Sequence, residues 1–343
     1  VLAAALVGLV DPIVRLISTP EEAVAGTTAY LTICFIGIPC ITAYNVLASI
    51  FRGMGDSRSP MYFIAAACVV NIGLDFFFMG ALRLGPAGAA LGTTLSQAVS
   101  VLLALCVILK HKSIRLSKSD FCPRKATMKD ILSIGLPVAA QDGFIQVSFM
   151  LITIMANQRG LTDAAAVGIV EKIISFLFLV PSSMLSTVSA LGAQNIGAGK
   201  YDRVDKILRY AIAIGVGFGA VMALLMQFIA PSMVRPFTSD EAVVLAGAAY
   251  IRSYIFDCLF AGIQFSFSGY FCAWGRSGLS FLHNTLSILL VRVPGAWLAC
   301  RFFPQTLVPM GLAPACGSLF SSIVCILLYR WMKRQNKPTG NKD

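Results

Sequence analysis

Charge is scarce in this sequence, and its scarcity excludes most soluble functions. Of the 343 residues, 13% are Asp, Glu, Lys or Arg, whereas a soluble globular domain carries roughly 25%. Hydrophobic residues make up 57%, and the mean hydropathy is +0.80. Apolar runs long enough to span a bilayer, about 18 residues or more, recur along the whole chain. We therefore predict a polytopic membrane protein, surrounded by a lipid bilayer and without a nucleic-acid partner.

Motifs for metal and covalent chemistry are lacking as well. The chain has only two histidines, His111 and His283, and no CxxC occurs among its ten cysteines, which excludes the usual zinc and haem sites. Nine of the cysteines lie in apolar segments, where a thiol behaves as a small hydrophobe. No His-rich, Asp-rich or Ser-His constellation is present. We therefore expect neither enzymatic activity nor a bound cofactor.

The apolar runs predict helices of membrane-spanning length. Strands are excluded because apolar and polar residues do not alternate. Each run has about the 20 residues that a helix needs to cross roughly 30 Å of hydrocarbon, or more. Ten spans are predicted, at residues 1–17, 28–51, 60–80, 86–109, 130–156, 163–190, 207–230, 242–271, 279–302 and 308–331.

Lys and Arg gather on one side of the predicted membrane. With the connection from Ser18 to Thr27 placed outside, 19 of the 27 Lys and Arg fall in inside loops, five fall at outside ends and three lie within spans. Cytoplasmic loops carry the excess of basic residues in membrane proteins. The net charge of +11 therefore predicts topology rather than nucleic-acid binding, and the C-terminus is expected in the cytoplasm.

Two parts of the chain repeat each other at a constant offset. Arg15 to Glu21, followed by Tyr30, matches Arg235 to Glu241, followed by Tyr250. The match continues from Phe51, Gly55 and Ser57 to Phe271, Gly275 and Ser277, and Gly85-x-Ala87-x-Ala89 aligns with Gly311-x-Ala313-x-Ala315 after a small insertion. An even number of spans separates the copies, so both have the same orientation. This is a parallel repeat about an axis along the membrane normal.

The second copy has six spans, two of which have no partner in the first. Their partners would lie upstream of Val1, so we expect an intact protein of twelve spans whose first two helices are absent from this chain. The expected fold class is an all-α polytopic membrane protein with two pseudo-symmetric helical bundles, four plus six spans here. Its expected parts are first-lobe helices at 1–110, a cytoplasmic linker at 111–129, a second-lobe bundle at 130–333 and a cytoplasmic tail at 334–343.

Five motifs, in order and spacing, resemble the multidrug and toxic compound extrusion (MATE) family of transporters, and the resemblance covers the entire chain. They are Arg52-Gly-Met-Gly-Asp56-Ser-Arg-Ser-Pro60, Asn71-Ile-Gly-Leu-Asp75, Gly85-Pro-Ala-Gly-Ala-Ala90, Gly135-Leu-Pro137 and Gly192-Ala-Gln-Asn-Ile-Gly-Ala-Gly-Lys200. The resemblance implies a V-shaped pair of bundles that exports mostly cationic organic compounds in exchange for Na⁺ or H⁺. In physical terms, the Arg and Asp of the first motif are interpreted as cap or topology residues of a tight turn.

A carboxylate inside the predicted membrane marks the candidate site of the first lobe. Asp75 follows Asn71 by four residues, so both side chains project from one helical face. Charge at mid-membrane costs at least about 2.5 to 3.5 kcal/mol, and carboxylate, amide and hydroxyl oxygens suit Na⁺, whereas a lone carboxyl can carry H⁺. The resemblance implies a cation-coupling site at Asn45, Asn71, Asp75 and Thr93, with a Na⁺ position at Asn71 and Asp75. A purely structural hydrogen-bonding role for Asp75 is the alternative.

Pseudo-symmetry favours a functional interpretation of this group. At the offset that takes Arg15 to Arg235, Asn45, Asn71 and Asp75 correspond to Phe265, Val291 and Gly295. Packing residues common to both bundles should recur in both copies, whereas a single functional site need not.

The second lobe has its own polar set, either a structural network or part of a substrate cavity. Its predicted members are Gln141, Asp142, Gln146, Glu171 and Arg292, and Lys172, Arg252, Asp257 and His283 are further polar residues in the same bundle. Asp142 and Arg292 both fall near mid-membrane by residue count, so we predict an ion pair between them, structural or substrate-lining. Some members of the family carry Glu and Asp on the helices around Gln146 and Ala261. This sequence departs from them at both places, which argues against a sodium site of that kind.

These features predict a secondary active exporter of drugs and toxic organic compounds, which works by antiport with Na⁺ or H⁺. We expect it to act as a monomer in the cell inner membrane, with small drug-like molecules as its substrates. The alternative is a flippase for lipid-linked oligosaccharides, which has a related architecture and a more basic central cavity.

Overall fold

The computed structural model describes residues 2–16, 21–110 and 124–335, and every regular element in these ranges is helical. The chain forms two compact units, residues 1–122 and 123–343, which we call the first and the second lobe. The boundary falls within the stretch expected as a linker, 111–129, of which 111–123 lie outside the described residues. An all-α membrane protein is confirmed.

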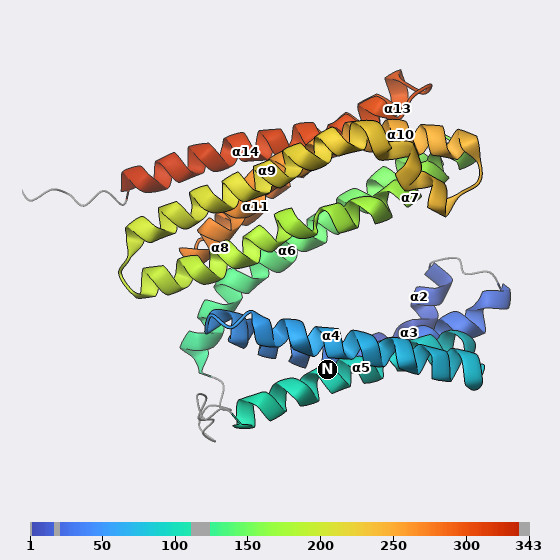
Figure 1. Ribbon diagram of the computed structural model, residues 1–343, viewed down its shortest axis with the longest axis horizontal. Helices are drawn as coiled ribbons and strands as arrows, with labels where there is room; N and C mark the ends of the chain where they lie inside the picture. The colour runs from blue at the N-terminus through green and yellow to red at the C-terminus, as the bar shows by residue number, and fades with distance from the viewer. Residues whose placement is uncertain (1, 17–20, 111–123, 336–343) are drawn as a thin grey trace, which may run out of the picture. The chain divides into compact units, whose positions relative to one another are not determined.

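The first lobe is built around two long helices that pack closely (Figure 1). Its elements are α1 (Leu2–Gly8), α2 (Val10–Leu16), α3 (Glu21–Gly53), α4 (Arg58–Asp75), the π-helix η1 (Phe76–Ala81) and α5 (Gly85–Lys110). Helices α3 and α5 meet at Gly37, where any Cβ would collide with the Thr94 side chain at 2.7 Å. Small residues allow this close approach of two backbones, as is usual between membrane helices.

The second lobe contains the remaining helices, which run alongside one another (Figure 1). They are α6 (Lys125–Asn157), α7 (Leu161–Leu177), α8 (Leu179–Gly197), α9 (Tyr201–Val234), the 3₁₀-helix η3 (Arg235–Phe237), α10 (Glu241–Tyr254), α11 (Phe256–Ala273), α12 (Ser277–Ser287), the π-helix η4 (Ile288–Arg292), α13 (Val293–Phe302) and α14 (Val308–Gln335). Helix α11 is the centre of the lobe, because it packs against α8, α9 and α14. Helices α9 and α11 cross at Gly215 and Gly262, where only glycine fits.

Membrane-spanning helices occur where the sequence predicts them, with one exception. The described residues contain eight helices long and apolar enough to cross a membrane, and the bent pair α7 and α8 would be a ninth. The exception is the predicted span 1–17, which is wrong as a single helix because it divides into α1 and α2, of seven residues each. Pro12 explains the division, since its ring clashes with the carbonyl four residues earlier, at Gly8, where α1 ends.

A second proline bends the span formed by α7 and α8. The two helices meet at Phe178 with a bend of 40°. Pro181 has no N–H to donate and crowds the carbonyl of Leu177, four residues earlier. That carbonyl instead lies 3.9 Å from the Cys258 thiol on α11, which is placed to donate to it. The bend therefore follows from a proline and is stabilised from the central helix.

Helix α6 corrects the predicted linker. It begins at Lys125, so residues 125–129 are helical and not part of a loop, because their Lys, Ala and Met are good helix formers. The first helix of the second lobe thus starts five residues earlier than expected. At the other end, α14 continues to Gln335, two residues into the predicted tail, and residues 336–343 lie outside the described part of the chain.

The internal repeat is reproduced in backbone geometry. Gly55 and Gly275, which are counterparts in the repeat, both have positive φ, 90° and 68°. Gly55 N donates to Arg52 O at 3.0 Å, and Gly275 N donates to Cys272 O at 3.0 Å. The next residue donates to a Phe carbonyl in both copies, at 2.9 and 2.8 Å. In the first copy the Asp56 carboxylate also accepts from the backbone N–H groups of the next helix, which confirms its interpretation as a cap residue.

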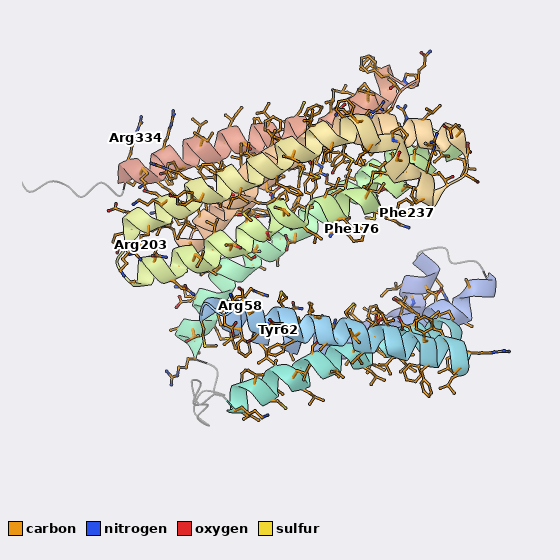
Figure 2. All side chains as sticks on the ribbon, viewed as in Figure 1. Arg58, Tyr62, Phe176, Arg203, Phe237 and Arg334 are labelled. Carbon is orange, nitrogen blue, oxygen red and sulfur yellow. The ribbon has the colours of Figure 1, made fainter. Side chains whose placement is uncertain are left out.

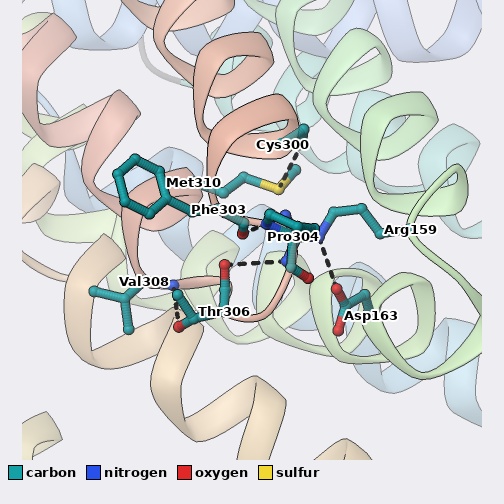
Figure 3. Close-up of polar contacts among 8 residues, drawn as sticks. All are labelled: Arg159, Asp163, Cys300, Phe303, Pro304, Thr306, Val308 and Met310. Carbon is teal, nitrogen blue, oxygen red and sulfur yellow. Dashed lines mark hydrogen bonds and ion pairs between the residues drawn. The ribbon is translucent and has the colours of Figure 1, made fainter.

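Arg159 connects the loop between α6 and α7 with the loop between α13 and α14, at one end of the second lobe (Figure 3). Arg159, between α6 and α7, forms an ion pair with Asp163 at 2.7 Å. Its guanidinium also donates to the carbonyls of Phe303, Pro304 and Thr306 at 3.0 to 3.1 Å. These carbonyls belong to the connection between α13 and α14, which has no regular structure of its own. The arginine thus satisfies backbone acceptors that a helix would otherwise satisfy.

Candidate functional site

Asp75 and Asn71 lie on one face of α4, as predicted, and this face is directed against helix α5. Both are half-buried, and a Cβ added at Gly92 of α5 would overlap Asp75 Oδ1 and lie 3.5 Å from Asn71 Nδ2. Asp75 Oδ1 and Asn71 Nδ2 are buried atoms without a hydrogen-bond partner among the described residues. An unsatisfied carboxylate oxygen inside a membrane span is costly. Binding of a cation or a proton to this oxygen would offset that cost.

The backbone departs from a regular α-helix directly after this carboxylate. Helix α4 ends at Asp75 and continues as the π-helix η1, Phe76–Ala81. π-helical turns are rare and occur frequently at functional sites. The wider turn changes the direction in which the side chains after Asp75 project. The sequence motif around Asp75 gave no sign of this feature.

Asn45 and Thr93 are placed differently from the expectation of a single four-residue cluster. Asn45 Nδ2 donates to Ile41 O at 2.9 Å, and Thr93 Oγ1 donates to Ala89 O at 3.0 Å, so each bonds to its own helix. Both side chains are exposed. No described hydrogen bond joins them to Asp75 or Asn71, although Thr93 directly follows Gly92. The structure thus brings together two of the four predicted residues.

The predicted ion pair between Asp142 and Arg292 is wrong. Asp142 is exposed, whereas Arg292 is 9% exposed and lies over the ring of Phe149, with 4.7 Å between the guanidinium carbon and the ring centroid. Phe149 follows Asp142 by seven residues, which is about 10 Å along a helix. Residue count therefore placed both groups at mid-membrane. It could not show that Arg292 contacts α6 at Phe149, two helical turns away from Asp142.

The exposed face of α6 carries polar residues at membrane depth. Asp142 and Gln146 are one helical turn apart, and both are exposed. Gln141, their neighbour, turns inward: it is 1% exposed, and its Oε1 accepts from Ser280 Oγ on α12 at 2.6 Å. A carboxylate on a lipid-facing surface would be expensive. The exposed stripe of Asp142 and Gln146 is therefore suited to a water-filled cavity.

Arg292 is the centre of a buried polar cluster in the second lobe. Its Nη2 donates to Tyr254 Oη at 2.8 Å, and its Nε has no partner among the described residues. Asp257 and Glu171 lie close enough to interact with it electrostatically. Glu171 is half-buried and accepts from Thr153 Oγ1 at 3.1 Å. Glu171 and Arg292, predicted as members of one network, are thus brought together.

Sequence reasoning did not single out the most deeply buried carboxylate. Asp257 is 1% exposed, and its Oδ1 has no hydrogen-bond partner among the described residues. Its position within an apolar span was the available signal, but the same signal applied to several other residues. Tyr254 and Thr153 were also missed, because neither is unusual in a membrane helix.

His283 forms a separate polar contact and takes no part in this cluster. Its ring is fully buried on α12, with Nε2 3.0 Å from Ser268 Oγ and Nδ1 2.8 Å from Ser321 Oγ. Both ring nitrogens are therefore satisfied, one as donor and one as acceptor. No group of three or more His, Cys, Asp and Glu that could hold a metal ion occurs in the described part of the chain.

Comparison with known proteins decides the family. A family model described as MatE matches residues 1–77 and 137–298. The chain belongs to the MatE family. It is similar to the probable multidrug resistance protein YpnP of Bacillus subtilis (strain 168), with 30% identity over 326 residues, covering 94% of this chain and 72% of YpnP. The multidrug export protein MepA of Staphylococcus aureus (strain NCTC 8325 / PS 47) is 27% identical over 271 residues, covering 78% of this chain and 59% of MepA.

Solved structures agree with this MatE assignment at the level of the fold. An outward-facing multidrug resistance MATE family transporter of the MOP superfamily superposes with a TM-score of 0.91 at 20% identity, covering 97% of this chain and 75% of that one. The family is one of transporters, so this MatE chain is a multi-pass membrane transporter.

Proposed function

We propose that this MatE protein exports organic, mostly cationic compounds in exchange for Na⁺ or H⁺, with Asp75 as the carboxylate that binds the coupling ion. The observation that carries the proposal is the buried Asp75 oxygen without a partner, held against Gly92 inside a membrane span. Export against a gradient requires a group that binds the ion more tightly in one state than in another. The names of YpnP and MepA support drug export.

The surroundings of Asp75 suit either ion. A proton would neutralise the carboxylate and remove the cost of burying its charge. For Na⁺, a flip of the Asn71 amide would present its oxygen in place of the unpartnered nitrogen, and hydroxyl or amide oxygens are ligands of hard cations. Thr93 and Asn45 would join after giving up the hydrogen bonds to their own helices.

The substrate is proposed from the exposed face of α6. Asp142 offers a negative charge and Gln146 an amide on that face, with half-buried Glu171 on α7 as a second carboxylate of the lobe. Such groups attract organic cations and repel anions. The flippase alternative, which would need a basic surface for a phosphate-bearing lipid, is not favoured, because the exposed residues at this depth of α6 are acidic or neutral.

The proposed location is the cell inner membrane, with a cytoplasmic C-terminus. The distribution of basic residues supports this orientation. Figure 2 shows Arg203, near the start of α9, and Arg334, near the end of α14, at the same end of the second lobe, with Phe237 at the opposite end. A single chain supplies every residue of the proposed site, so the monomer is proposed as the functional unit.

Replacement of Asp75 by Asn tests the proposal. The change removes the charge and the titratable proton at nearly constant volume, so packing is preserved. The protein is reconstituted in liposomes, and uphill transport of ethidium is measured under an imposed Na⁺ gradient and under an imposed pH gradient. We expect Asp75→Asn to reduce uphill transport to the level of protein-free vesicles under the gradient that drives the wild type, while ethidium binding is retained.

Asp202→Asn is the matched control, because it neutralises an exposed carboxylate at the start of α9, outside the proposed site. It should transport like the wild type. If a well-folded Asp75→Asn protein concentrates ethidium at the wild-type rate, Asp75 is not the coupling residue. If the wild type moves no organic cation under either gradient, drug export itself is wrong.

A further inference from the structure

The two lobes place opposite charges at nearly equivalent positions of the repeat. The position that corresponds to Asp75 in the second lobe is Gly295, and Arg292 precedes it by three residues, about one helical turn. Both charged residues lie beside a π-helical segment: Asp75 precedes η1, and Arg292 ends η4. The second lobe thus has a cation about one helical turn from the position where the first lobe has an anion.

A glycine of the next helix lies close to each of the two residues. In the first lobe, Gly92 of α5 lets the Asp75 carboxylate lie against the helix. In the second lobe, Gly317 of α14 lets the start of the Arg292 side chain lie close to the helix, since a Cβ there would lie 3.1 Å from Ser287 Oγ and 3.2 Å from Arg292 Cβ. The repeat aligns Gly85 with Gly311 and therefore Gly92 with Ser318, so Gly317 lies one residue before the counterpart of Gly92. The two sites thus lie close to counterpart positions of the repeat and carry opposite charge.

The Arg292 side chain is held in place from several helices. Tyr254 on α10 accepts its hydrogen bond, and Phe149 on α6 offers the face of its ring. Cation–π contact of this kind is strongest when the cation is removed from water, as it is here at 9% exposure. These contacts form a specific binding site for the planar guanidinium group.

Asp257 is the group that depends most on this cation. It is 1% exposed, its Oδ1 has no partner among the described residues although the carboxylate has a side-chain hydrogen bond with Ser318, and Arg292 lies within electrostatic reach. Glu171, which likewise accepts a hydrogen bond, from Thr153, depends on Arg292 less because it is only half-buried. A deeply buried carboxylate requires a nearby positive charge or a proton.

We propose that Arg292 is a covalently attached cation that fills the cation position of the second lobe, so that this lobe binds no free coupling ion. Exchange of a free cation is then confined to the first lobe, a consequence that rests on the proposed function of Asp75. The statement about Arg292 itself does not depend on it. Arg292 thereby determines how many coupling ions the transporter binds.

Chemical rescue tests the attached cation directly. The melting temperature of the purified full chain is measured in detergent at constant ionic strength, with increasing methylguanidinium chloride in place of choline chloride. We expect Arg292→Ala to lower the melting temperature by about 10 °C, since it leaves a buried carboxylate without its partner. Methylguanidinium should then raise it again in a saturable manner, and it should leave the wild type unchanged.

Two matched variants make the result specific. Arg292→Ala combined with Asp257→Asn removes the charge that needs a cation, so it should melt at a higher temperature than Arg292→Ala and show no rescue. Arg252→Ala removes an exposed arginine of the same lobe, and it should show no rescue either. If Arg292→Ala fails to fold while the double variant folds, the proposal is supported by that contrast. Equal responses of Arg292→Ala and Arg252→Ala to methylguanidinium would overturn it.

Sodium titration separates this proposal from the function proposed for Asp75. If Na⁺ stabilises the wild type saturably, Asp75→Asn should abolish the effect. An Asp75→Asn protein that Na⁺ still stabilises saturably would show a free-cation site outside the first lobe, and the proposal for the second lobe would be wrong. No Na⁺ effect in either protein agrees with a second lobe that binds no free ion. Failure of Asp75→Asn to impair transport leaves the rescue result standing.

Discussion

At the scale of single residues, position along a helix was easier to predict than position around it. Asp75 and Asn71 were correctly expected to lie together, because a spacing of four residues fixes their common face. Gly92 could not be linked to them, since the contact between α4 and α5 depends on the tertiary packing of two helices. The pairing of Asp142 with Arg292 was wrong for the same reason. Residue count gives depth in the membrane but not the neighbour.

Gly92 allows a prediction at this scale. A Cβ at this position would overlap Asp75 Oδ1 and lie 3.3 Å from Asp75 Cγ, so Gly92→Ala must turn the carboxylate away from α5. We expect uphill ethidium transport to fall strongly, while the free energy of unfolding falls by only about 1 to 2 kcal/mol, because a short side chain can move aside. Transport rates at equal reconstituted protein and thermal melts check both expectations.

Gly73→Ala is the matched control for Gly92→Ala. Gly73 lies on α4 between Asn71 and Asp75, and a Cβ there has nothing within 4 Å. Alanine should be tolerated or slightly stabilising, because it is the better helix former. If Gly73→Ala and Gly92→Ala transport equally well, the approach of α5 to Asp75 has no role in transport.

At the scale of elements, helix type was predicted from composition and helix breaks were not. Nine of the predicted spans correspond to helices or bent helix pairs, because apolar length alone determines them. The breaks at Gly8 and Phe178 depend on Pro12 and Pro181, whereas Pro39, Pro137 and Pro314 lie inside long helices. Whether a proline divides a helix depends on which neighbouring group satisfies the freed carbonyl. That information is tertiary.

The connection between α13 and α14 provides a prediction for an element without regular structure. Arg159 donates to three of its carbonyls, and its side chain is 6% exposed. We expect Arg159→Met to reduce the free energy of unfolding by about 2 to 4 kcal/mol, since hydrogen bonds from a charged donor contribute about 1.5 to 3 kcal/mol each and the loop can partly rearrange. Denaturant unfolding in mixed micelles measures this loss.

Two further arginine variants define the origin of that effect. Arg159→Lys keeps the charge but loses the planar fork that reaches several carbonyls, so it should recover only part of the stability. Arg235 pairs with Glu241 at the surface, with both side chains 61% exposed, and Arg235→Met should cost less than about 1 kcal/mol. Equal losses for Arg159→Met and Arg235→Met would mean that the loop carbonyls do not depend on Arg159.

At the scale of the whole molecule, the repeat was the most informative feature of the sequence, because it survives in the backbone. The turns at Gly55 and Gly275 have matching φ signs and matching hydrogen bonds, so both lobes are built on one plan. The candidate functional residues lie where the two copies of the repeat carry different residues. The carboxylate of one lobe and the arginine of the other lie within about one helical turn of counterpart positions, and neither charge could be interpreted from one copy alone.

The same plan predicts the topology of the chain. Turns related by the repeat must lie on the same side of the membrane, and the basic residues predict that this side is the cytoplasm. Fusions of green fluorescent protein, which fluoresces in the cytoplasm, and of alkaline phosphatase, which is active outside it, are made after Ser57, after Ser277 and at the C-terminus. We expect fluorescence without phosphatase activity at all three positions.

A fusion after Ser239, in the connection between η3 and α10, should give the opposite result, because α9 separates this connection from the cytoplasmic end that carries Lys200 and Arg203. Phosphatase activity at Ser57 together with fluorescence at Ser277 would make the repeat inverted rather than parallel, and the near-equivalence of Asp75 and Arg292 in the repeat would then have to be abandoned.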